Sequence, residues 1–340
     1  MSAEGTKSSK HRVLFAVKLI ASLAILGFVL YKADLSLVLD RMRQADPLFL
    51  ALVLLTPFAG YAITSIRWQG LLRAAGAVVP FGRLYRACLT AVFFNQLLPS
   101  TVGGDVARVY AAWKSGAPRS VALSSLLVDR VIGVLAQVLV AAAIIPFLVS
   151  STLPTAVYFT VGGIALAVGT LVLAVFQPSS KPAALILSIV DRVPGPFAKI
   201  ARKLEAGFAP YRGRWGVLAR AIMISLVMIV NVVLMHWLIG RALGLDLSIL
   251  VYLFVIPVAT IVMLVPISIN GIGLREAIFA LLLGAYGVDK ADAVALSLLA
   301  FATFLTHGIL GGILFAVARS PIPADVPDND LPGNVVEAKT

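Results

Sequence analysis

Long apolar stretches follow one another along most of this chain. A helix of about 19 or more apolar residues is long enough to cross the roughly 30 Å hydrocarbon core of a membrane. Hydrophobic residues make up 60% of the sequence and charged residues only 13%, a balance that would leave large apolar areas wet in a soluble protein. The sequence therefore predicts an all-α polytopic membrane domain over 13–317 with about six transmembrane helices. The predicted spans are 13–31, 48–66, 121–149, 155–176, 217–239 and 293–317.

Two further apolar segments are short and interrupted by proline and glycine. Residues 84–98 and 106–113 flank the letters PSTVGG, and residues 249–265 and 277–286 flank PISINGIG. Segments that are too short to span and are broken in this way are typical of re-entrant hairpins or discontinuous helices. We expect two such broken-helix hairpins. Their break motifs contain Pro99, Gly103 and Gly104 in the first hairpin and Pro266, Gly271 and Gly273 in the second.

The two breaks share the pattern P-x4-G-x3-R, which ends at Arg108 in the first and at Arg275 in the second. Each half of the chain then continues into the letters VALS, at 121–124 and 294–297. In a topology with both termini on one side, the first hairpin enters from the cytoplasm and the second from outside. This predicts an inverted repeat, as in many secondary transporters. Repeat one covers about 48–149 and repeat two about 217–317.

Lysine and arginine residues gather on alternate connections. They are frequent in the tail 1–12, after the second span and in the loop 178–215, whereas 150–154 is uncharged and 32–47 carries both signs. The positive-inside rule then predicts a multi-pass inner-membrane protein with both termini in the cytoplasm. The loop 178–215 contains an amphipathic segment that suits an anionic lipid surface or a lid on the bundle. The proline-rich tail 318–340 is expected to be disordered.

An arginine follows each break beside a carboxylate, with Arg108 near Asp105 and Arg275 next to Glu276. A broken helix exposes backbone amides and points a helix N-terminus at the break, and a guanidinium completes a site for a phosphate or a carboxylate. We expect Arg108 and Arg275 to converge on one water-accessible pocket. Alternatively, each arginine only neutralises its neighbouring carboxylate. We expect Arg275 and Glu276, being adjacent on a helix, not to face each other squarely.

Ionisable residues also occur within the third predicted span. Asp129 and Arg130 lie some two turns from its cytoplasmic end, where charge is costly and usually faces a bundle interior or a wet cavity. Asp129, Gly133 and Gln137 share one helix face. We expect Asp129 to pair with a hairpin arginine or to carry a proton. His307, on a similar face of the sixth span with Thr303 and Gly311, is a proton site or a packing residue.

Amide side chains stand close to both breaks. Asn95 and Gln96 precede the first break, and Asn270 lies within the second. Such amides can bind a headgroup or cap freed backbone groups, and capping is the favoured role for Asn270.

Signatures of catalysis, cofactor binding and nucleic-acid binding are missing from the sequence. The letters GIGLRE lack the third glycine of a dinucleotide-binding turn, and neither a P-loop, an H-E-x-x-H pair nor a nucleophile elbow occurs. The three histidines lack metal-ligand spacing, and Cys88 is the single cysteine. The basic residues, which give a net charge of +12, are dispersed without an aromatic platform for nucleic acid. We expect no enzyme activity, no metal and no cofactor.

Three passages resemble the lysylphosphatidylglycerol synthase transmembrane-region family, whose members are also called flippase-like domain proteins. They read FFNQLLPSTVGGDVARVYAAW, ALSSLLVDRVIGVL and PISINGIGLREAIFALLLGAYGV, and the resemblance extends over 13–317. It implies a polytopic helical domain with re-entrant elements that handles polar lipids. In full-length synthases this domain is coupled to a soluble aminoacyl transferase. Only a short tail follows residue 317 here, so we do not expect lysyl transfer by this chain alone. The matching polar positions are Asp105, Arg108, Asp129, Arg130, Arg275 and Glu276.

These observations lead to a functional hypothesis with two alternatives. A flippase-like protein would hold the phosphate of a phospholipid or of a polyprenyl-phosphate-linked headgroup with Arg108 and Arg275, and Asp129 or Glu276 would tune their charge. The alternatives are a non-transporting partner of a separate glycosyl- or aminoacyltransferase, and a secondary transporter for a small anion. The sequence names neither the lipid, the coupling ion nor the oligomeric state.

Overall fold

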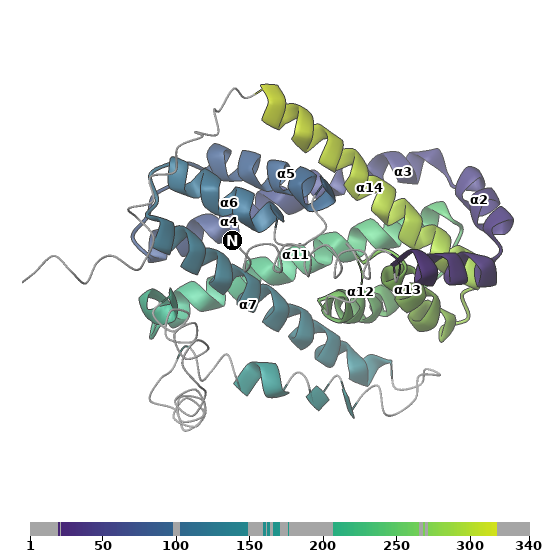
Figure 1. Cartoon of the computed structure of the whole chain (residues 1–340). Helices are drawn as coiled ribbons and strands as arrows, with labels where there is room; N and C mark the ends of the chain where they lie inside the picture. Colours follow the sequence, from purple (N-terminus) through teal and green to yellow (C-terminus); the bar gives the residue numbers. More distant parts are fainter. Residues whose placement is uncertain are drawn as a thin grey trace, which may run out of the picture.

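Helices form almost all of the chain that the computed structural model describes, which comprises residues 20, 22–97, 103–148, 159–160, 162–163, 166–170, 176, 207–264, 268 and 271–317 (Figure 1). No strand occurs in these ranges. The predicted all-α polytopic membrane fold is confirmed. The predictions for the tails 1–12 and 318–340, and for most of 178–215, concern residues outside the described ranges.

Four helical stretches in the described part of the chain are long and apolar enough to cross a membrane. Each has 28 or 29 residues and corresponds to one predicted span, extended at one or both ends. The predicted span 155–176 lies mainly outside the described ranges. The four stretches are Pro47–Ala74, Arg119–Phe147, Trp215–Ala242 and Lys290–Val317.

The chain bends sharply at Asp34, just after the first predicted span. The helix Ser22–Ala33 and helix α2 (Leu35–Gln44) meet at 77°, and together they would make a fifth, broken span. Asp34 has a φ of 59°, and its carboxylate accepts a hydrogen bond from the Ser36 amide at 3.0 Å. This is the N-cap bond that starts a helix. The connection expected at 32–47 therefore contains a capped helix.

The second predicted span consists of two helices in line, α3 (Pro47–Val53) and α4 (Thr56–Ala74). The Thr56 hydroxyl donates to the carbonyl of Val53 at 2.8 Å and bridges the join. The amide of Asp46 donates to the carbonyl of Ala242 at 2.9 Å, which fixes the start of α3 to the end of α11.

Each predicted hairpin contains two helices that pack on each other. The first is formed by α5 (Phe81–Leu97) and α6 (Gly103–Lys114), the second by α12 (Ile249–Met263) and α13 (Leu274–Gly284). The break residues Pro99 and Pro266, and also Asn270, lie outside the described residues. Whether the pairs are re-entrant in a membrane stays a prediction.

Three longer helices complete the bundle. Helix α7 (Arg119–Ile144) continues into the short helix η1 (Ile145–Phe147). The short helix η2 (Ala209–Tyr211) precedes α11 (Trp215–Ala242), and α14 (Lys290–Val317) ends the described chain. The Tyr211 hydroxyl donates to the carbonyl of Leu71 at 3.2 Å and holds η2 against α4.

The helices contact one another in matched pairs. Helix α5 packs on α14 as α12 packs on α7, and α6 packs on α7 as α13 packs on α14. Helices α4 and α11, which open the two predicted repeats, pack on each other. Two repeats related by a two-fold axis would make these same pairings. The contact pattern thus agrees with the predicted repeat, and the side from which each hairpin enters the membrane stays a prediction.

Small residues allow α14 of the second repeat to pack closely on α5 of the first. A Cβ atom added to Gly311 of α14 would collide with the backbone carbonyl of Leu89 on α5, and one added to Gly312 would meet the ring of Phe93 at 2.7 Å. Helices packed this closely gain many dispersion contacts between their backbones. The predicted face with Thr303, His307 and Gly311 therefore contributes a helix-packing surface, which is the packing interpretation given above rather than the proton site.

Candidate functional site

A cavity of about 480 Å³ lies between helices of both predicted repeats. Its walls come from α4, α5 and α7 of the first repeat and from α11, α12, α13 and α14 of the second. Most of its lining is apolar. A mostly apolar hollow with a few placed polar groups is the usual form of a ligand site. The polar side chains that line it are Tyr61, Asn95, Gln96, Gln137, His236, Thr260 and Arg275.

Arg275 supplies a positive charge to the wall of this cavity. Its Nη2 donates to Glu276 Oε1 at 2.7 Å, and its Nε donates to Ser297 Oγ at 2.9 Å. The guanidinium carbon lies 4.8 Å from the centre of the Phe301 ring, and 11% of the side chain is exposed. Within the described part of the chain its Nη1 makes no hydrogen bond, so this amino group can donate to a ligand oxygen.

Glu276 is almost fully buried, and its hydrogen bonds in the described structure come from its own helix start and from α14. Its Oε2 accepts from the Gly273 amide at 2.7 Å, and its Oε1 accepts from Arg275 and from the Ser297 hydroxyl. The expectation that Arg275 and Glu276 would not face each other is therefore wrong. Glu276 folds back over the first turn of α13 to cap it, and this places its other oxygen beside the neighbouring guanidinium.

Two residues near the first break line the cavity from the last turn of α5. Asn95 Oδ1 accepts a hydrogen bond from the Gly104 amide at 2.8 Å, which satisfies a free donor at the start of α6. Gln96 packs close to Gly308 of α14. Gly271 lines the cavity from the second break and has a φ of 75°, a conformation that favours glycine. The capping role is thus observed for Asn95.

Two buried polar atoms at this cavity lack a hydrogen-bond partner among the described residues. They are Tyr61 Oη and Gln137 Oε1. Buried polar atoms in folded proteins are nearly always paired, because an unpaired one costs about 1 to 3 kcal/mol. Both atoms have almost no accessible surface in this structure, so a ligand would bond them only after neighbouring side chains move.

Two histidines have the same local geometry but different surroundings. His236 Nδ1 and His307 Nδ1 each lie 2.8 Å from the carbonyl four residues earlier, that of Val232 and of Thr303. Since a carbonyl only accepts, each Nδ1 carries the hydrogen of this bond. His236 lines the cavity, whereas His307 packs edge-on against Phe58. The environment of His307 is that of a packing residue.

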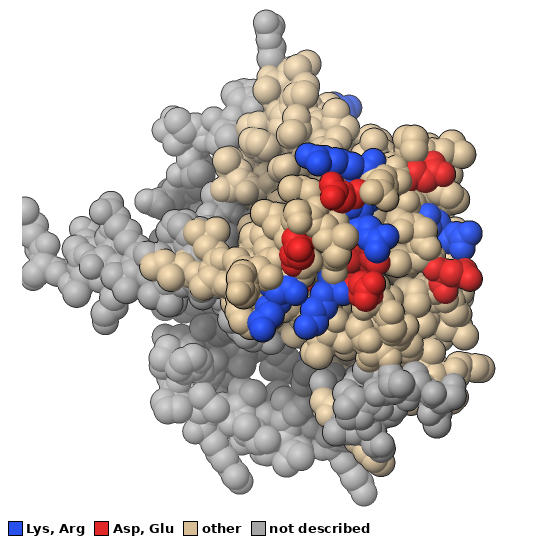
Figure 2. Space-filling model, turned by 90° about the vertical axis from the view of Figure 1, so that its right-hand side faces the viewer, with Lys and Arg blue, Asp and Glu red and all other residues tan. Residues whose placement is uncertain are grey.

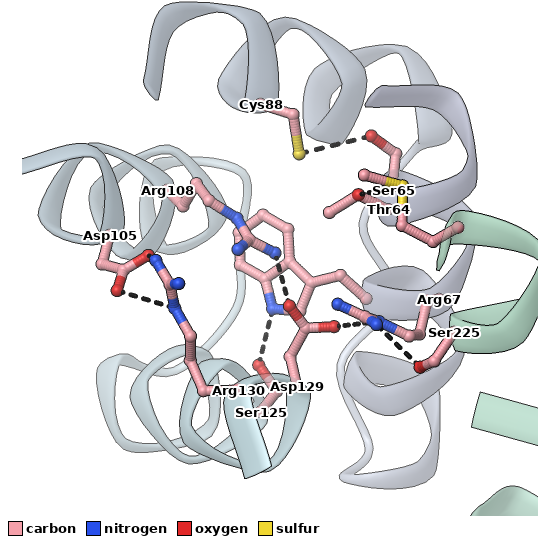
Figure 3. Close-up of polar contacts among 12 residues, drawn as sticks. Thr64, Ser65, Arg67, Cys88, Asp105, Arg108, Ser125, Asp129, Arg130 and Ser225 are labelled. Carbon is pink, nitrogen blue, oxygen red and sulfur yellow. Dashed lines mark hydrogen bonds and ion pairs between the residues drawn. The ribbon is translucent and has the colours of Figure 1, made fainter. Parts of the chain in front are cut away.

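A second polar centre in the described structure is a buried ion cluster (Figure 3). Asp129 of α7 accepts from Arg67 Nε of α4 at 2.6 Å and from Arg108 Nη2 of α6 at 3.1 Å. The Arg67 Nη1 also donates to Ser225 Oγ of α11 at 2.7 Å. Arg108 lies over the Trp68 ring at 4.4 Å. The predicted pairing of Asp129 with a hairpin arginine is present, and the cluster joins four helices.

A more exposed pair stands next to this cluster. Arg130 Nη2 lies 2.6 Å from Asp105 Oδ1, and Arg130 Nε donates to the other oxygen of the same carboxylate, so the pair is bidentate (Figure 3). The alternative in which Arg108 neutralises Asp105 is therefore wrong. Asp105 faces Arg130 because α6 presents its first turn to α7, whereas Arg108, nearly one turn further along, is buried against Trp68.

The expected convergence of Arg108 and Arg275 on one pocket is also wrong. Arg275 lines the central cavity, and Arg108 is absent from its described lining because the Asp129 carboxylate and the Trp68 ring hold it elsewhere. The two arginines that follow the breaks thus occupy different environments. One contacts the cavity, and the other belongs to the buried ion cluster.

One face of α7 links the cluster to the cavity. Asp129 is in the cluster, Gln137 lines the cavity, and Gly133 between them faces the Arg67 guanidinium, which would make an ordinary contact of 3.6 Å with an added Cβ. Arg67 is not among the predicted site residues, because it directly follows the predicted span 48–66 and so counts among the basic residues of a cytoplasmic connection. The helix in fact continues to Ala74, and this greater length is what places Arg67 inside the bundle.

The two centres suit different chemical tasks. The cavity combines apolar walls, one guanidinium with a free amino group and several neutral polar groups, which together can hold a charged headgroup and its apolar surroundings. The ion cluster is closed and has one carboxylate for two guanidiniums, so its direct role is to connect helices.

Residues 15–311 match the family described as the lysylphosphatidylglycerol synthase TM region. Similar proteins include a UPF0104 membrane protein of Pyrococcus horikoshii, 25% identical over 319 residues that cover 87% of this chain and 95% of the relative. Another is a UPF0104 membrane protein of Methanothermobacter thermautotrophicus, 24% identical over 75% of this chain and 81% of the relative. With its membrane-length helices and a match over most of its length, this multi-pass membrane protein belongs to the lysylphosphatidylglycerol synthase TM-region family.

Proposed function

We propose that this protein binds the phosphate-bearing headgroup of a membrane lipid in the central cavity and moves it between leaflets. The observation that carries the proposal is the position of Arg275, which lines a cavity shared by both halves of the chain and whose Nη1 makes no hydrogen bond in the described residues. A guanidinium in an apolar setting binds phosphate through short, charge-assisted hydrogen bonds.

The surroundings of Arg275 suit reversible binding. Glu276 neutralises the guanidinium, and Ser297 fixes its orientation, so the unliganded site carries no uncompensated charge. A phosphate then gains the remaining donor at Nη1 without having to satisfy a bare buried cation. Binding of moderate strength is what a transporter needs, because the ligand has to leave again.

The neutral polar groups widen the range of headgroup contacts. In this proposal Tyr61 Oη and Gln137 Oε1, which are buried and lack partners in the described chain, bond the part of a headgroup beyond the phosphate after neighbouring side chains move. The proposal also requires that the acyl or prenyl tails stay in lipid while the headgroup occupies the mostly apolar cavity.

The helix pairing supplies a way to expose the cavity to either side. In the proposed cycle, α5–α14 and α12–α7 move as two units about the contact of α4 with α11. The buried cluster of Arg67, Arg108 and Asp129 joins α7 to α4, α6 and α11, and in this proposal it is the point about which the α12–α7 unit turns. In this proposal Arg108 braces the helices, and Arg275 alone holds the phosphate.

The test is lipid translocation by the purified protein in proteoliposomes. A fluorescent phospholipid is placed in both leaflets, and dithionite reports how fast the inner-leaflet label becomes accessible. Arg275→Gln should slow the protein-dependent rate at least about tenfold, since a lost charge-assisted bond costs about 1.5 to 3 kcal/mol. Arg241→Gln is the matched control, because Arg241 is exposed and its ion pair among the described residues is with the exposed Asp246.

An Arg275→Gln variant that is folded and translocates at the wild-type rate would refute the phosphate role. A wild-type protein without any translocation activity would instead favour the non-transporting role as a partner of a separate lipid-modifying enzyme.

A further inference from the structure

A second hollow lies outside the central cavity, between the Ser22–Ala33 helix, α13 and the start of α14. Its volume is about 550 Å³. Apolar side chains line most of it, and two of them, Phe28 and Leu281, are 62% and 73% exposed. Apolar side chains this exposed face lipid in a membrane protein. The hollow is therefore a groove on the lipid-facing surface of the bundle.

Helix α13 separates this groove from the central cavity. Arg275 and Phe279 line the cavity, whereas Ala277, Ala280 and Gly284 line the groove. With about 100° between successive residues of a helix, these two sets lie on opposite faces of α13. A molecule in the groove would therefore contact the back of the helix whose front carries Arg275.

The groove is open because small residues face it. A Cβ added to Gly284 would meet no atom within 4 Å. Along the membrane-facing side of a helix, such small residues leave space that an acyl chain can fill with dispersion contacts.

The charged residues that line the groove in the described structure are Lys32 and Lys290. The carboxylates next to them in sequence, Asp34 and Asp289, do not line it, and Asp292 is engaged by Arg41 at 3.1 Å. Figure 2 shows that both signs of charge are mixed over this end of the molecule, so the positive character is a local property of the groove. Two ammonium groups beside an apolar channel complement a lipid phosphate with its acyl chain.

We propose that this groove binds one anionic glycerophospholipid, with its phosphate between Lys32 and Lys290 and an acyl chain against the small residues of α13. The lipid would pack on the face of α13 opposite the face that carries Arg275. This site is separate from the central cavity, so the proposal does not depend on translocation.

The test is native mass spectrometry of the full chain with phosphatidylglycerol and phosphatidylcholine of identical acyl chains, supplied in equal amounts. The wild type should retain the anionic lipid roughly thirtyfold better, because each of the two lysines near a lipid phosphate contributes about 1 kcal/mol. The double variant Lys32→Gln, Lys290→Gln should reduce this ratio to near one. Gly284→Leu, which fills the groove, should remove the bound lipid whatever its headgroup.

Further variants test whether the retained lipid is bound in the groove. Arg43→Gln with Arg241→Gln removes the same charge from exposed positions and should leave the ratio unchanged. Asp289→Asn should raise the ratio of anionic to zwitterionic lipid, because it removes a negative charge next to Lys290. Arg275→Gln should leave the groove lipid in place even if it abolishes translocation, which separates this proposal from the function proposed above. Circular dichroism and thermal unfolding of Gly284→Leu would show that the variant is folded, and Gly284→Ala provides a smaller change at the same position.

Equal retention of the two lipids by the wild type would overturn the proposal, and so would a ratio that falls equally in the lysine variant and its charge control. A lipid-free dimer that dissociates in Gly284→Leu would identify a second copy of the chain as the occupant instead.

Discussion

The Asp129 carboxylate lies 2.6 Å from the Arg67 guanidinium, although the two residues are 62 positions apart in sequence. Both side chains are at least nine-tenths buried, and Arg108 bonds the other oxygen of the carboxylate. A buried charge is tolerated only when it is paired and hydrogen-bonded. This contact therefore holds α4 against α7, and its loss would leave two buried cations without their shared partner.

Replacement of Asp129 by asparagine should destabilise the protein strongly. The amide keeps the volume of the side chain but removes the negative charge that both arginines share. Breaking a buried ion pair by removing one partner costs about 3 to 5 kcal/mol. Thermal unfolding in detergent, followed by tryptophan fluorescence, measures the change.

Asp246→Asn provides the control for this experiment, because its side chain is 99% exposed and its contact with Arg241 contributes little. Equal thermal unfolding of Asp129→Asn and the wild type would show that the cluster does not hold the helices together. If Arg67→Ala is added to Asp129→Asn, its further effect should be smaller than its effect in the wild type, because the two residues stabilise one contact.

Gly311→Ala should weaken the contact of α14 with α5. The added methyl group would collide with the backbone carbonyl of Leu89, and backbone cannot move aside as a flexible side chain can. Overpacking of this kind costs about 1 to 3 kcal/mol. The measurement is again thermal unfolding. Gly70→Ala is the matched control in α4, where an added Cβ meets no atom within 4 Å, and it should leave stability unchanged or raise it.

The division into two similar halves could be predicted from sequence because it depends on local patterns. Apolar length predicted six spans, four of which correspond to membrane-length helices in the described residues, and the repeated P-x4-G-x3-R motif predicted two equivalent broken pairs. Matched contacts, such as α5 on α14 and α12 on α7, agree with that repeat. These features need only the period and length of apolar segments.

The side chains that each arginine contacts could not be predicted in the same way. Arg108 and Arg275 occupy equivalent positions in the motif, but Arg108 meets Asp129 and Trp68, whereas Arg275 meets Glu276 and Ser297. Most of these partners come from helices that are distant in sequence, and they differ between the halves. Arg67 was missed for a related reason, because helix α4 continues beyond the apolar stretch and carries it into the interior.

Tyr61→Phe should separate ligand binding from stability. The Tyr61 hydroxyl is buried and lacks a partner in the described chain, so its removal should leave the unfolding temperature unchanged or slightly raised. If this hydroxyl bonds a lipid headgroup, the variant should also translocate that lipid more slowly. Thermal unfolding and the dithionite assay on the same preparation measure both effects. A marked loss of stability would show that the hydroxyl has a structural role instead.

Glu276→Gln should make the stability of the protein depend on anionic lipid. The glutamine has a single acceptor oxygen, so it can keep the bond from Gly273 or the one from Ser297 but not both, and Arg275 loses its counter-charge at the cavity wall. In detergent alone, the variant should unfold at a lower temperature than the wild type, because a buried cation is left uncompensated. A lipid phosphate would then replace the missing charge.

Anionic lipid should therefore raise the unfolding temperature of Glu276→Gln more than that of the wild type, since a ligand stabilises in proportion to its affinity for the folded state. Zwitterionic lipid of the same chain length should restore less. The tighter binding should also slow release, so the variant should translocate more slowly although it retains more lipid. Ser297→Ala removes one hydrogen bond to Arg275 without a change of charge and should not show this lipid dependence. Equal rescue of Glu276→Gln by anionic and zwitterionic lipids would mean that Arg275 does not bind the lipid phosphate.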